Sequence, residues 1–485
     1  MNTNPMLLAD FYKIAHRKMY PPGTELVYST WTPRGSRVPG CSEFVWFGLQ
    51  AFLKHRILDQ FQRTFFEASL SEVTQSYRRI ITNCLGDQDP DVSHIEQLWH
   101  LGYLPLRIRA LDEGTVVPLR MPVMTLENTD PRFFWLTNYI ETLMSVELWQ
   151  PSTSATIARR YRKAFDAAAL ATVGSTDFCQ FQGHDFSMRG MGCLEAAIGS
   201  GMGHLLSFAG TDTIPAIEAH ELYYGANVEK ELVGTSVPAT EHSVQCAYGD
   251  DEEYIRHIIT NVHPSGIVSV VSDGYDFWDV MTRILPSLKD VIMVRDGKLV
   301  IRPDSGDPVK IICGDPRAPS AAERAGAIEV LWNTFGGTVS ERGYRCLDPH
   351  VGLIYGDAIT LGRQGEILAR LAEKRFASTN VVLGIGSYTY QYQTRDSFGL
   401  ALKSTLVRKN GGEVHIFKTP KTDDGTKNSQ RGRVAVRRNE DGTLYWTERH
   451  RLDEHVPGNL LVDVFRDGKL VREHTLSEIR ARVAG

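Results

Sequence analysis

The sequence GIVSVVSD (residues 266–273) is the first of four apolar runs that decide the fold of this chain; the others are LVIRPD (299–304), VGLIYGD (351–357) and NVVLGIG (380–386). Between them lie segments with helical apolar spacing, such as SAAERAGAIEVLWNTF (320–335) and LGRQGEILARLAEKRF (361–376). Buried strands that alternate with helices are typical of a parallel sheet covered on both faces. We therefore expect an α/β fold, an irregular α/β barrel over residues 151–404, with functional residues at the carboxyl ends of its strands.

The segments on either side of this region follow other patterns. The first 150 residues mix helical patterns with short strands, and Thr129-Asp130-Pro131 predicts a helix start with proline in the first turn. Late in the chain, strand patterns are separated by Asn410-Gly411-Gly412 and by Glu440-Asp441-Gly442, which are hairpin signals. We expect residues 1–150 and 405–485 to form one discontinuous, β-rich domain.

Length, charge and composition limit the possible classes of protein. A chain of 485 residues exceeds one typical core, and 42% hydrophobic with 23% charged residues is typical of a globular enzyme. The net charge of −5 gives no reason to bind nucleic acid, so an anionic substrate would require cations gathered locally. No run of about 18 apolar residues predicts a membrane helix. The seven cysteines form no C-x-x-C pair and the N-terminus has no basic leader, so we expect a soluble, cytoplasmic protein.

Polar residues cluster where the four apolar runs end. Arg302 can grip a phosphate with two parallel hydrogen bonds, and Asp304 can accept from a ribose hydroxyl or help to hold Mg²⁺. Asp273, Gly356-Asp357 and Gly386 end the other runs, where small residues let a backbone N–H approach a phosphate. Ordinary loops between strands and helices also favour Gly, Asp and Ser. Four repetitions in one barrel nevertheless favour a sugar-phosphate site.

A single histidine lies in the motif Pro238-Ala239-Thr240-Glu241-His242-Ser243. A histidine beside a glutamate is more often structural than catalytic. For a nucleophilic role, a carboxylate such as Asp273 or Glu241 must hold Nδ1 of His242 and leave Nε2 free. The residues alone leave both roles open.

Two further motifs carry the side chains that a flat polar base and a phosphate require. HDFSMRG (184–190) contains Phe186 and Arg189, and GTDT (210–213) contains Asp212, although Phe186 alone is better explained as a core residue. The glycine-rich stretch 190–206 lacks the G-x-G-x-x-G fingerprint and predicts a close-packed helix. Basic residues recur late, and they form either a solvated face or the required cationic patch: Arg395, Lys403, Lys418, Lys427, Arg431 and Arg433.

In this order, the motifs resemble those of the nicotinamide phosphoribosyltransferases, within the type II phosphoribosyltransferases. The resemblance runs from Asp10-Phe11-Tyr12-Lys13 to Thr394-Arg395-Asp396 and the GRV segment at 432–434. It implies transfer of a phosphoribosyl group from phosphoribosyl pyrophosphate to nicotinamide in NAD salvage. It also implies coupling to ATP through a phosphohistidine, Mg²⁺ that accompanies the pyrophosphate, and a homodimer with active sites at the subunit interface.

The resemblance also implies roles for single residues. Phe186 would stack on one face of the nicotinamide ring and Tyr12 of the second subunit on the other, while Arg189 and Asp212 orient the base. His242 would be phosphorylated, with Glu241 and Asp273 as its hydrogen-bonding support. The remaining contacts would be to the nucleotide phosphate (Arg302, Gly386), the ribose (Asp304, Gly356, Asp357) and other phosphates (Arg395, Lys403, Lys418, Lys427), with no side chain as a direct metal ligand.

Asp212 gives a physical reason to prefer nicotinamide over nicotinate. Its carboxylate can accept a hydrogen bond from the carboxamide, whereas nicotinate brings a second carboxylate, and like charges about 4 Å apart repel by about 4 kcal/mol at an effective dielectric of 20. Departures from the family pattern at Ile385, Ser387 and Ala401 bear on phosphate affinity. The alternatives are a nicotinate phosphoribosyltransferase and, in a different class, a non-catalytic interaction protein on the same scaffold.

Overall fold

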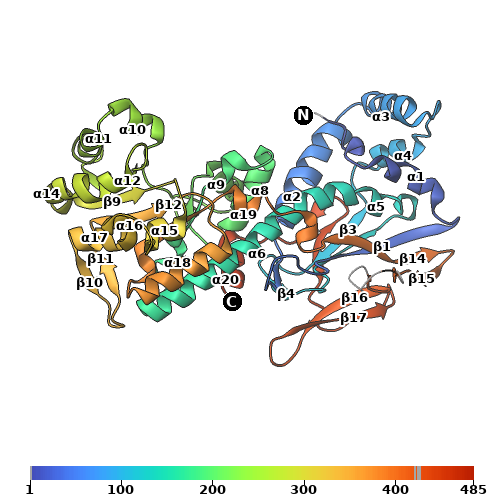
Figure 1. The fold of residues 1–485 in the computed structure, drawn as a ribbon. Helices are drawn as coiled ribbons and strands as arrows, with labels where there is room; N and C mark the ends of the chain where they lie inside the picture. Colours follow the sequence, from blue (N-terminus) through green and yellow to red (C-terminus); the bar gives the residue numbers. More distant parts are fainter. Residues whose placement is uncertain (1–2, 420–421, 423–427) are drawn as a thin grey trace. The chain divides into compact units, whose positions relative to one another are not determined.

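The computed structural model describes residues 3–419, 422 and 428–485 (Figure 1). Its contacts divide the chain into two compact units. Unit 1 runs to Thr156 and also contains His220–Ala226 and the chain from Gln393 onward; unit 2 contains Ile157–Ala219 and Asn227–Tyr392. The domain boundaries near residues 150 and 404 expected from the sequence stay a prediction, because contact density does not establish independent folding.

Unit 2 is built on a six-stranded sheet in which every neighbouring pair is parallel. The four apolar runs are four of its strands, so that part of the prediction is confirmed. The strands, in sheet order, are β7 (Gly210–Thr211), β6 (Gly183–Asp185), β13 (Val381–Ile385), β12 (Val351–Tyr355), β9 (Asp296–Arg302) and β8 (Ser265–Val271).

Both edges of this sheet bond to one extended segment, residues 235–239. The backbone N–H of Thr211 in β7 donates to the carbonyl of Thr235 (2.9 Å), and that of Ser269 in β8 donates to the carbonyl of Pro238 (2.9 Å). Isolated parallel bridges join the segment to β7 and β8. The expected parallel sheet is therefore present, and its regular strands form half of a barrel. The segment that bonds to both of its edges is irregular backbone and not a regular strand.

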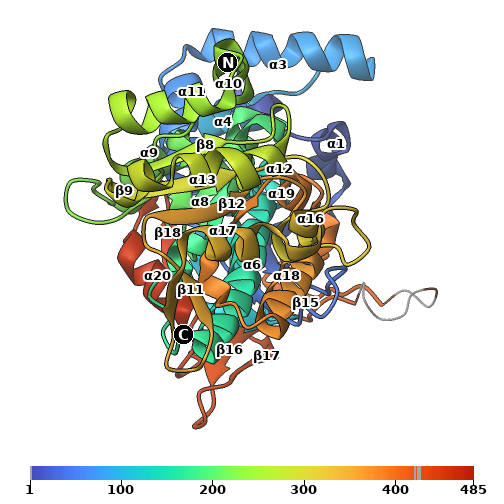
Figure 2. The same ribbon diagram turned by 60° about the vertical axis from the view of Figure 1, so that its left-hand side comes forward.

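Helices cover the parallel sheet and bury its apolar side chains. Val268, Ile301, Leu353 and Leu383, one from each of the four long strands, are fully buried in one core. Figures 1 and 2 show α17 beside β12, which it contacts. Among the described residues, the α-helices that lie wholly in unit 2 are α7 (Cys179–Gln182), α8 (Leu194–His204), α10 (His242–Tyr248), α11 (Asp251–His257), α12 (Phe277–Asp279), α13 (Leu285–Ser287), α14 (Lys289–Met293), α15 (Pro308–Cys313), α16 (Ala321–Ala325), α17 (Ala327–Phe335), α18 (Leu361–Glu373) and α19 (Ser387–Tyr390).

The segment expected as one helix over 320–335 is two helices, α16 and α17. They are separated at Gly326, whose φ of +84° lies outside the helical region. A Cβ at this position would meet the backbone N of Gly314 at 2.3 Å, so the bend requires glycine. By contrast, the second predicted segment forms the single helix α18, and the small-residue stretch after residue 190 forms α8, as expected.

Unit 1 is built on a seven-stranded sheet that joins the two ends of the chain. Strand β1 pairs antiparallel with β14, with Thr30 opposite Lys403. The expected hairpins are confirmed, since β14 turns into β15 at residues 410–411 and β16 (Arg433–Arg438) turns into β17 (Leu444–His450) at residues 439–443. The sheet order is β15 (Gly412–His415), β14 (Ala401–Lys409), β1 (Thr24–Thr32), β5 (Met124–Asn128), β3 (Leu106–Ala110), β18 (Val462–Arg466) and β19 (Lys469–Leu470).

The predicted helix start at residues 129–131 is a 3₁₀ turn. The side chain of Asp130 accepts from the backbone N–H of Arg132 (2.9 Å), and Pro131 opens the turn. Other helices of unit 1 are α1 (Phe11–Met19), α2 (Leu49–Phe52), α3 (Leu70–Leu85), α4 (Ser93–Leu101), α5 (Leu136–Tyr139) and α20 (Leu476–Ala484), while α6 (Glu141–Thr172) and α9 (Ile214–Tyr224) have residues in both units.

No helix within the described residues is both long and apolar enough to span a membrane. The cytoplasmic location expected from the sequence stays a prediction.

Candidate active site

The structure gathers most of the predicted site residues at the carboxyl end of the parallel sheet in unit 2. Each follows the end of a strand, and carboxyl ends of parallel strands meet at one edge. The residues are Phe186 after β6, Asp212 after β7, Asp273 after β8, Asp304 after β9, Gly356 and Asp357 after β12, and Gly386 after β13.

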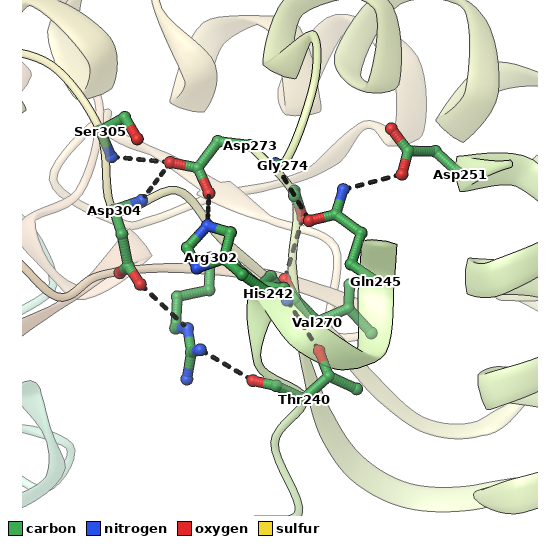
Figure 3. Close-up of polar contacts among 12 residues, drawn as sticks. Thr240, His242, Gln245, Asp251, Val270, Asp273, Gly274, Arg302, Asp304 and Ser305 are labelled. Carbon is green, nitrogen blue, oxygen red and sulfur yellow. Dashed lines mark hydrogen bonds and ion pairs between the residues drawn. The ribbon is translucent and has the colours of Figure 1, made fainter. Parts of the chain in front are cut away.

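His242 and Asp273 form a hydrogen-bonded pair (Figure 3). Nε2 of His242 lies 3.0 Å from Oδ1 of Asp273, and the other carboxylate oxygen accepts from the backbone N–H groups of Asp304 (2.8 Å) and Ser305 (2.7 Å). The Asp273 side chain is 5% exposed and that of His242 is 45% exposed, so the carboxylate is fixed and the imidazole is accessible.

Two expectations about His242 were wrong. The carboxylate holds Nε2 and not Nδ1, so Nδ1 is the nitrogen left for chemistry. Glu241 accepts a hydrogen bond from the hydroxyl of Ser243 and, within the described structure, does not bond to the imidazole, although it adjoins His242 in the chain. The sequence could not show either point, because both depend on side-chain rotation.

The surroundings of Asp273 keep it ionised. Burial raises the pKa of its carboxyl, but hydrogen bonds from Ser305, Asp304 and His242 lower it further than burial raises it, and the net pKa lies below the usual value. A carboxylate only accepts hydrogen bonds, so Nε2 of His242 carries the proton. With the proton on Nε2, Nδ1 is the unprotonated nitrogen of the neutral ring, and this is the form that attacks phosphorus.

Arg302 and Asp304 make a second polar cluster beside this pair. Nη2 of Arg302 donates to the carbonyl of Thr240 (2.7 Å), and its Nε lies 3.9 Å from Oδ2 of Asp304. Among the described residues, Nε is buried without a hydrogen-bond partner. Burial raises the pKa of Asp304, although Arg302 opposes that rise. A guanidinium beside a partly exposed carboxyl is suited to a phosphate with an adjoining ribose hydroxyl.

Phe186 forms a platform that lies against two glycines, and one of them, Gly384, leaves the room that its ring needs. A Cβ at Gly384 would lie 2.4 Å from Cδ2 of Phe186, and one at Gly356 would lie 3.5 Å from the same atom. The His184 ring packs on another part of Phe186, with centroids 4.6 Å apart at 43°. Phe186 is therefore half-buried, and part of its ring is left for stacking. Taken alone in the sequence, Phe186 was better explained as a core residue, but the structure does not bury it fully.

Asp212 is oriented by two donors that bind the same oxygen. Oδ1 accepts from Nε2 of His184 (2.9 Å) and from the hydroxyl of Ser236 (2.7 Å). Burial raises the pKa of Asp212, but these two bonds hold the net value below the usual range. The two donors leave Oδ2 available to a ligand. Sequence reasoning gave no role to Ser236 or to His184, although His184 lies in the quoted motif HDFSMRG. Arg189 is exposed in the turn Met188–Gly190.

The late basic residues include a cationic cluster in unit 1. Burial lowers the pKa of Lys403; Glu141 opposes this, while Arg34, Lys418 and Arg395 lower it further by charge repulsion. Three cations thus act on Lys403, and Arg34 among them was not expected. Arg431 instead stacks 3.6 Å over the Phe417 ring, Arg433 donates to three backbone carbonyls, and Lys427 lies outside the described residues.

Tyr12 lies on α1 in unit 1 and is 59% exposed. It lines a hollow of about 260 Å³ together with Asp10, Glu141, Trp149 and Arg395. Nζ of Lys13 lies 4.9 Å from the centroid of the Tyr12 ring and forms an ion pair with Glu141. The ring is therefore held next to Arg395 and remains accessible.

Metal-binding side chains are not gathered in the part of the chain that the structure describes. It contains no group of three or more His, Cys, Asp or Glu residues that is suited to a metal ion. Two of the acidic residues at the strand ends make other contacts: Asp304 lies near Arg302, and Asp273 bonds to His242 and to backbone N–H groups.

Comparison with known proteins gives consistent matches over most of the chain. The model of the nicotinate phosphoribosyltransferase (NAPRTase) family matches residues 181–469, and that of the nicotinamide phosphoribosyltransferase N-terminal domain matches residues 4–83. The nicotinamide phosphoribosyltransferase of Acinetobacter baylyi is 47% identical over 99% of this chain and 97% of its own length. That of Mycoplasma pneumoniae is 35% identical over 88% of this chain and 94% of its own length.

Two solved structures share the fold. Nicotinate-nucleotide pyrophosphorylase from Pyrococcus furiosus has a TM-score of 0.60 at 16% identity, over 99% of this chain and 94% of its own. Human nicotinic acid phosphoribosyltransferase has a TM-score of 0.56 at 16% identity, over 99% and 92%. At this identity the likeness concerns the fold alone.

Proposed function

This chain belongs to the nicotinamide phosphoribosyltransferase family, and from that premise we propose that it transfers the phosphoribosyl group of phosphoribosyl pyrophosphate to nicotinamide, giving nicotinamide mononucleotide and pyrophosphate in NAD salvage. The observation that carries the proposal is the common position of Phe186, Asp212, Arg302 and Asp304 at one end of the parallel sheet. Together they offer an aromatic surface for the base, a hydrogen-bond acceptor for an amide, a hydrogen-bond donor for a phosphate and a hydrogen-bond acceptor for a ribose hydroxyl.

The base binds through Phe186 and Asp212. The pyridine ring stacks on Phe186, and Oδ2 of Asp212 accepts from the carboxamide NH₂, because His184 and Ser236 occupy Oδ1. Arg189 adds a donor for the carboxamide oxygen. Nicotinate would place its carboxylate against that of Asp212, and a repulsion of about 4 kcal/mol corresponds to roughly a thousandfold discrimination.

The transfer itself needs positioning more than acid–base catalysis. The bond from C1 of the ribose to the pyrophosphate oxygen breaks with its electron pair on the pyrophosphate, and the neutral ring nitrogen forms the new bond to C1. No proton moves. Arg302 and Gly386 hold the nucleotide phosphate, and Asp304, Gly356 and Asp357 contact the ribose. Fixing both reactants in this geometry supplies much of the rate.

ATP acts through His242. Nδ1 attacks the γ-phosphorus of ATP, the bond between that phosphorus and the bridging oxygen breaks, and ADP leaves with the electron pair. Asp273 keeps the proton on Nε2 and stabilises the positive charge that develops on the ring. Mg²⁺ would be held mainly by the oxygens of the pyrophosphate or ATP, whose charge it would neutralise, and Asp304 would help to hold it without being a direct ligand.

We also propose that the enzyme is a homodimer in which Tyr12 of one subunit stacks on the base bound in the other. Supporting this, α1 exposes Phe11, Tyr12 and Met19, three large apolar side chains on one short helix. The cationic cluster of Arg34, Arg395, Lys403 and Lys418 supplies phosphate contacts, with Lys427 as a further candidate from the sequence. The bridges of residues 235–239 support an irregular α/β barrel closed by that segment.

Product analysis with each base tests the function. The chain is incubated with phosphoribosyl pyrophosphate and either nicotinamide or nicotinate, and mononucleotide formation is measured with and without ATP. We expect nicotinamide to be preferred by at least about a hundredfold in kcat/KM. Equal or better use of nicotinate would overturn the role of Asp212, and no product from either base would favour an interaction protein.

The role of His242 has its own test. With ATP labelled on the γ-phosphate, we expect acid-labile label on the wild-type chain and none on His242→Ala. Asp273→Asn should label slowly, because the amide can donate to Nε2 and so favours the wrong tautomer. Full labelling of His242→Ala would show that another residue accepts the phosphoryl group.

A further inference from the structure

The helix that carries His242 has almost no apolar anchor. His242 is the first residue of α10, a helix of seven residues, and Gln245 is the only one of the seven that is buried. At the other end of α10, Tyr248 packs on Tyr254 with ring centroids 5.5 Å apart. A helix normally holds its position by burying an apolar stripe. The N-terminal part of α10 buries a polar amide instead.

Gln245 ties this helix to the loop that carries Asp273 (Figure 3). Its Oε1 accepts from the backbone N–H of Gly274 (3.0 Å), and its Nε2 donates to Oδ1 of Asp251 (2.7 Å). Gln245 is 1% exposed, so its amide is shielded from water and both bonds are at least partly buried. A Cβ at Gly274 would lie 2.5 Å from Oε1, and the close approach of the two segments therefore depends on a glycine next to Asp273.

We infer that Gln245 is a positioning residue that keeps His242 in line with Asp273 and thereby sets the coupling to ATP. The inference rests on the proposed phosphorylation of His242. The amide of Gln245 bonds to Gly274 and Asp251 and not to the imidazole, so it acts by fixing the two segments that carry the reacting pair. The His242–Asp273 bond spans 3.0 Å, and a displacement of about 1 Å at a reacting group can lower a rate about a hundredfold.

The amide of Gln245 and the carboxylate of Asp251 can be exchanged between the two positions. This exchange separates the loss of their hydrogen bond from other effects of substituting Gln245. In Gln245→Glu, two carboxylates face each other where the amide donated, so the tether breaks. Asp251→Asn is the matched control, because its amide oxygen still accepts from Gln245. The double variant Gln245→Glu with Asp251→Asn restores both bonds, because the carboxylate introduced at position 245 accepts from the backbone N–H of Gly274 and from the amide introduced at position 251.

The measurements are label transfer from γ-labelled ATP, turnover with and without ATP, and KM for nicotinamide. For Gln245→Glu we expect label transfer and the ATP-stimulated part of turnover to fall about tenfold or more, with KM for nicotinamide unchanged. The control and the double variant should stay within about threefold of wild type. Thermal unfolding checks that each variant folds; if Gln245→Glu does not, Gln245→Met keeps the volume without the hydrogen bonds.

Three results would overturn the inference. Full label transfer in both Gln245→Glu and Gln245→Met would remove any role for the tether. An equal loss of turnover with and without ATP would make Gln245 a structural residue only. A wild-type chain that takes no label would overturn the proposed phosphorylation itself, and the role of Gln245 with it.

Discussion

The ring of Phe186 occupies the space that a side chain at residue 384 would fill: a Cβ at Gly384 would lie 2.4 Å from Cδ2 of Phe186. Phe186 directly follows β6 and Gly384 lies in β13, and these two strands are adjacent and parallel. Gly384, which comes two residues before the predicted phosphate contact Gly386, therefore has a role of its own. It creates the recess in which the aromatic platform lies, and this links a phosphate-binding loop to the binding of the base.

Gly384→Ala should displace the Phe186 ring and weaken nicotinamide binding. A contact of 2.4 Å cannot be accommodated without movement of one strand or the ring, and overpacking of this kind costs about 1–3 kcal/mol. We expect KM for nicotinamide to rise about tenfold in steady-state assays. Gly365→Ala is the control, since Gly365 is exposed on α18 with nothing within 4 Å of the added Cβ. An unchanged KM in Gly384→Ala would show that the ring does not support the base.

Asp212→Asn should relax the choice between nicotinamide and nicotinate. The substitution removes the negative charge that repels the nicotinate carboxylate, and the new amide can donate a hydrogen bond to it. We expect the ratio of kcat/KM for the two bases to fall by about a hundredfold or more, measured by mononucleotide formation from each. Asp177→Asn, at an exposed carboxylate of the same unit, serves as the control. Retained discrimination in Asp212→Asn would mean that another group excludes nicotinate.

The strands were predictable in proportion to their length and apolar content. The runs that became β8, β9, β12 and β13 have five to seven strand residues each, and their buried side chains leave a clear pattern. β6 and β7 have three and two residues, too few for any period, and only the motifs around them pointed to the site. The split between α16 and α17 was missed because a glycine within a helical pattern does not reveal its φ.

The site was predictable as a set of residues but not as a set of contacts. Asp273, Arg302 and Asp304 were identified because functional residues of an α/β barrel lie at the carboxyl ends of its strands. The support of Asp212 by His184 joins residues 28 apart in sequence, and the tether of Gln245 to Gly274 joins residues 29 apart. Nothing in their spacing signals these contacts. The choice of Nε2 over Nδ1 at His242 depends on a ring rotation, which sequence does not encode locally.

Lys403→Ala should weaken the binding of phosphoribosyl pyrophosphate. Lys403 is half-buried, and the charges of the other three members of the cationic cluster, Arg34, Lys418 and Arg395, act on it in the absence of an anion. A bound pyrophosphate would relieve that repulsion, so we expect KM for phosphoribosyl pyrophosphate to rise about tenfold and to depend less on salt. Lys409→Ala, at the exposed end of the same strand, should have little effect. Equal effects of the two variants would place the phosphates elsewhere.

His204 should make the stability of unit 2 fall in mild acid. The imidazole is fully buried between the hydroxyl of Tyr390 (2.7 Å from Nδ1) and the carbonyl of Gly210 (3.0 Å from Nε2). Burial lowers the pKa of His204 to about 4, against about 6.5 in the unfolded chain. Between these values the unfolded chain binds the proton and the folded chain does not. The stability that neutral His204 contributes is therefore fully present above about pH 6.5 and is lost as the pH falls toward 4.

Replacement of the titrating group isolates this contribution. In His204→Gln the amide retains polar contacts but cannot titrate, so the variant loses less stability on acidification than wild type does. We expect the wild-type advantage in unfolding free energy to shrink between about pH 7 and pH 4.5 by an amount on the order of 2–3 kcal/mol. Urea unfolding at several pH values, followed by tryptophan fluorescence, measures it. His257→Gln, at an exposed histidine of the same unit, should leave the wild-type slope intact. Parallel slopes for wild type and His204→Gln would show that His204 takes up its proton without unfolding.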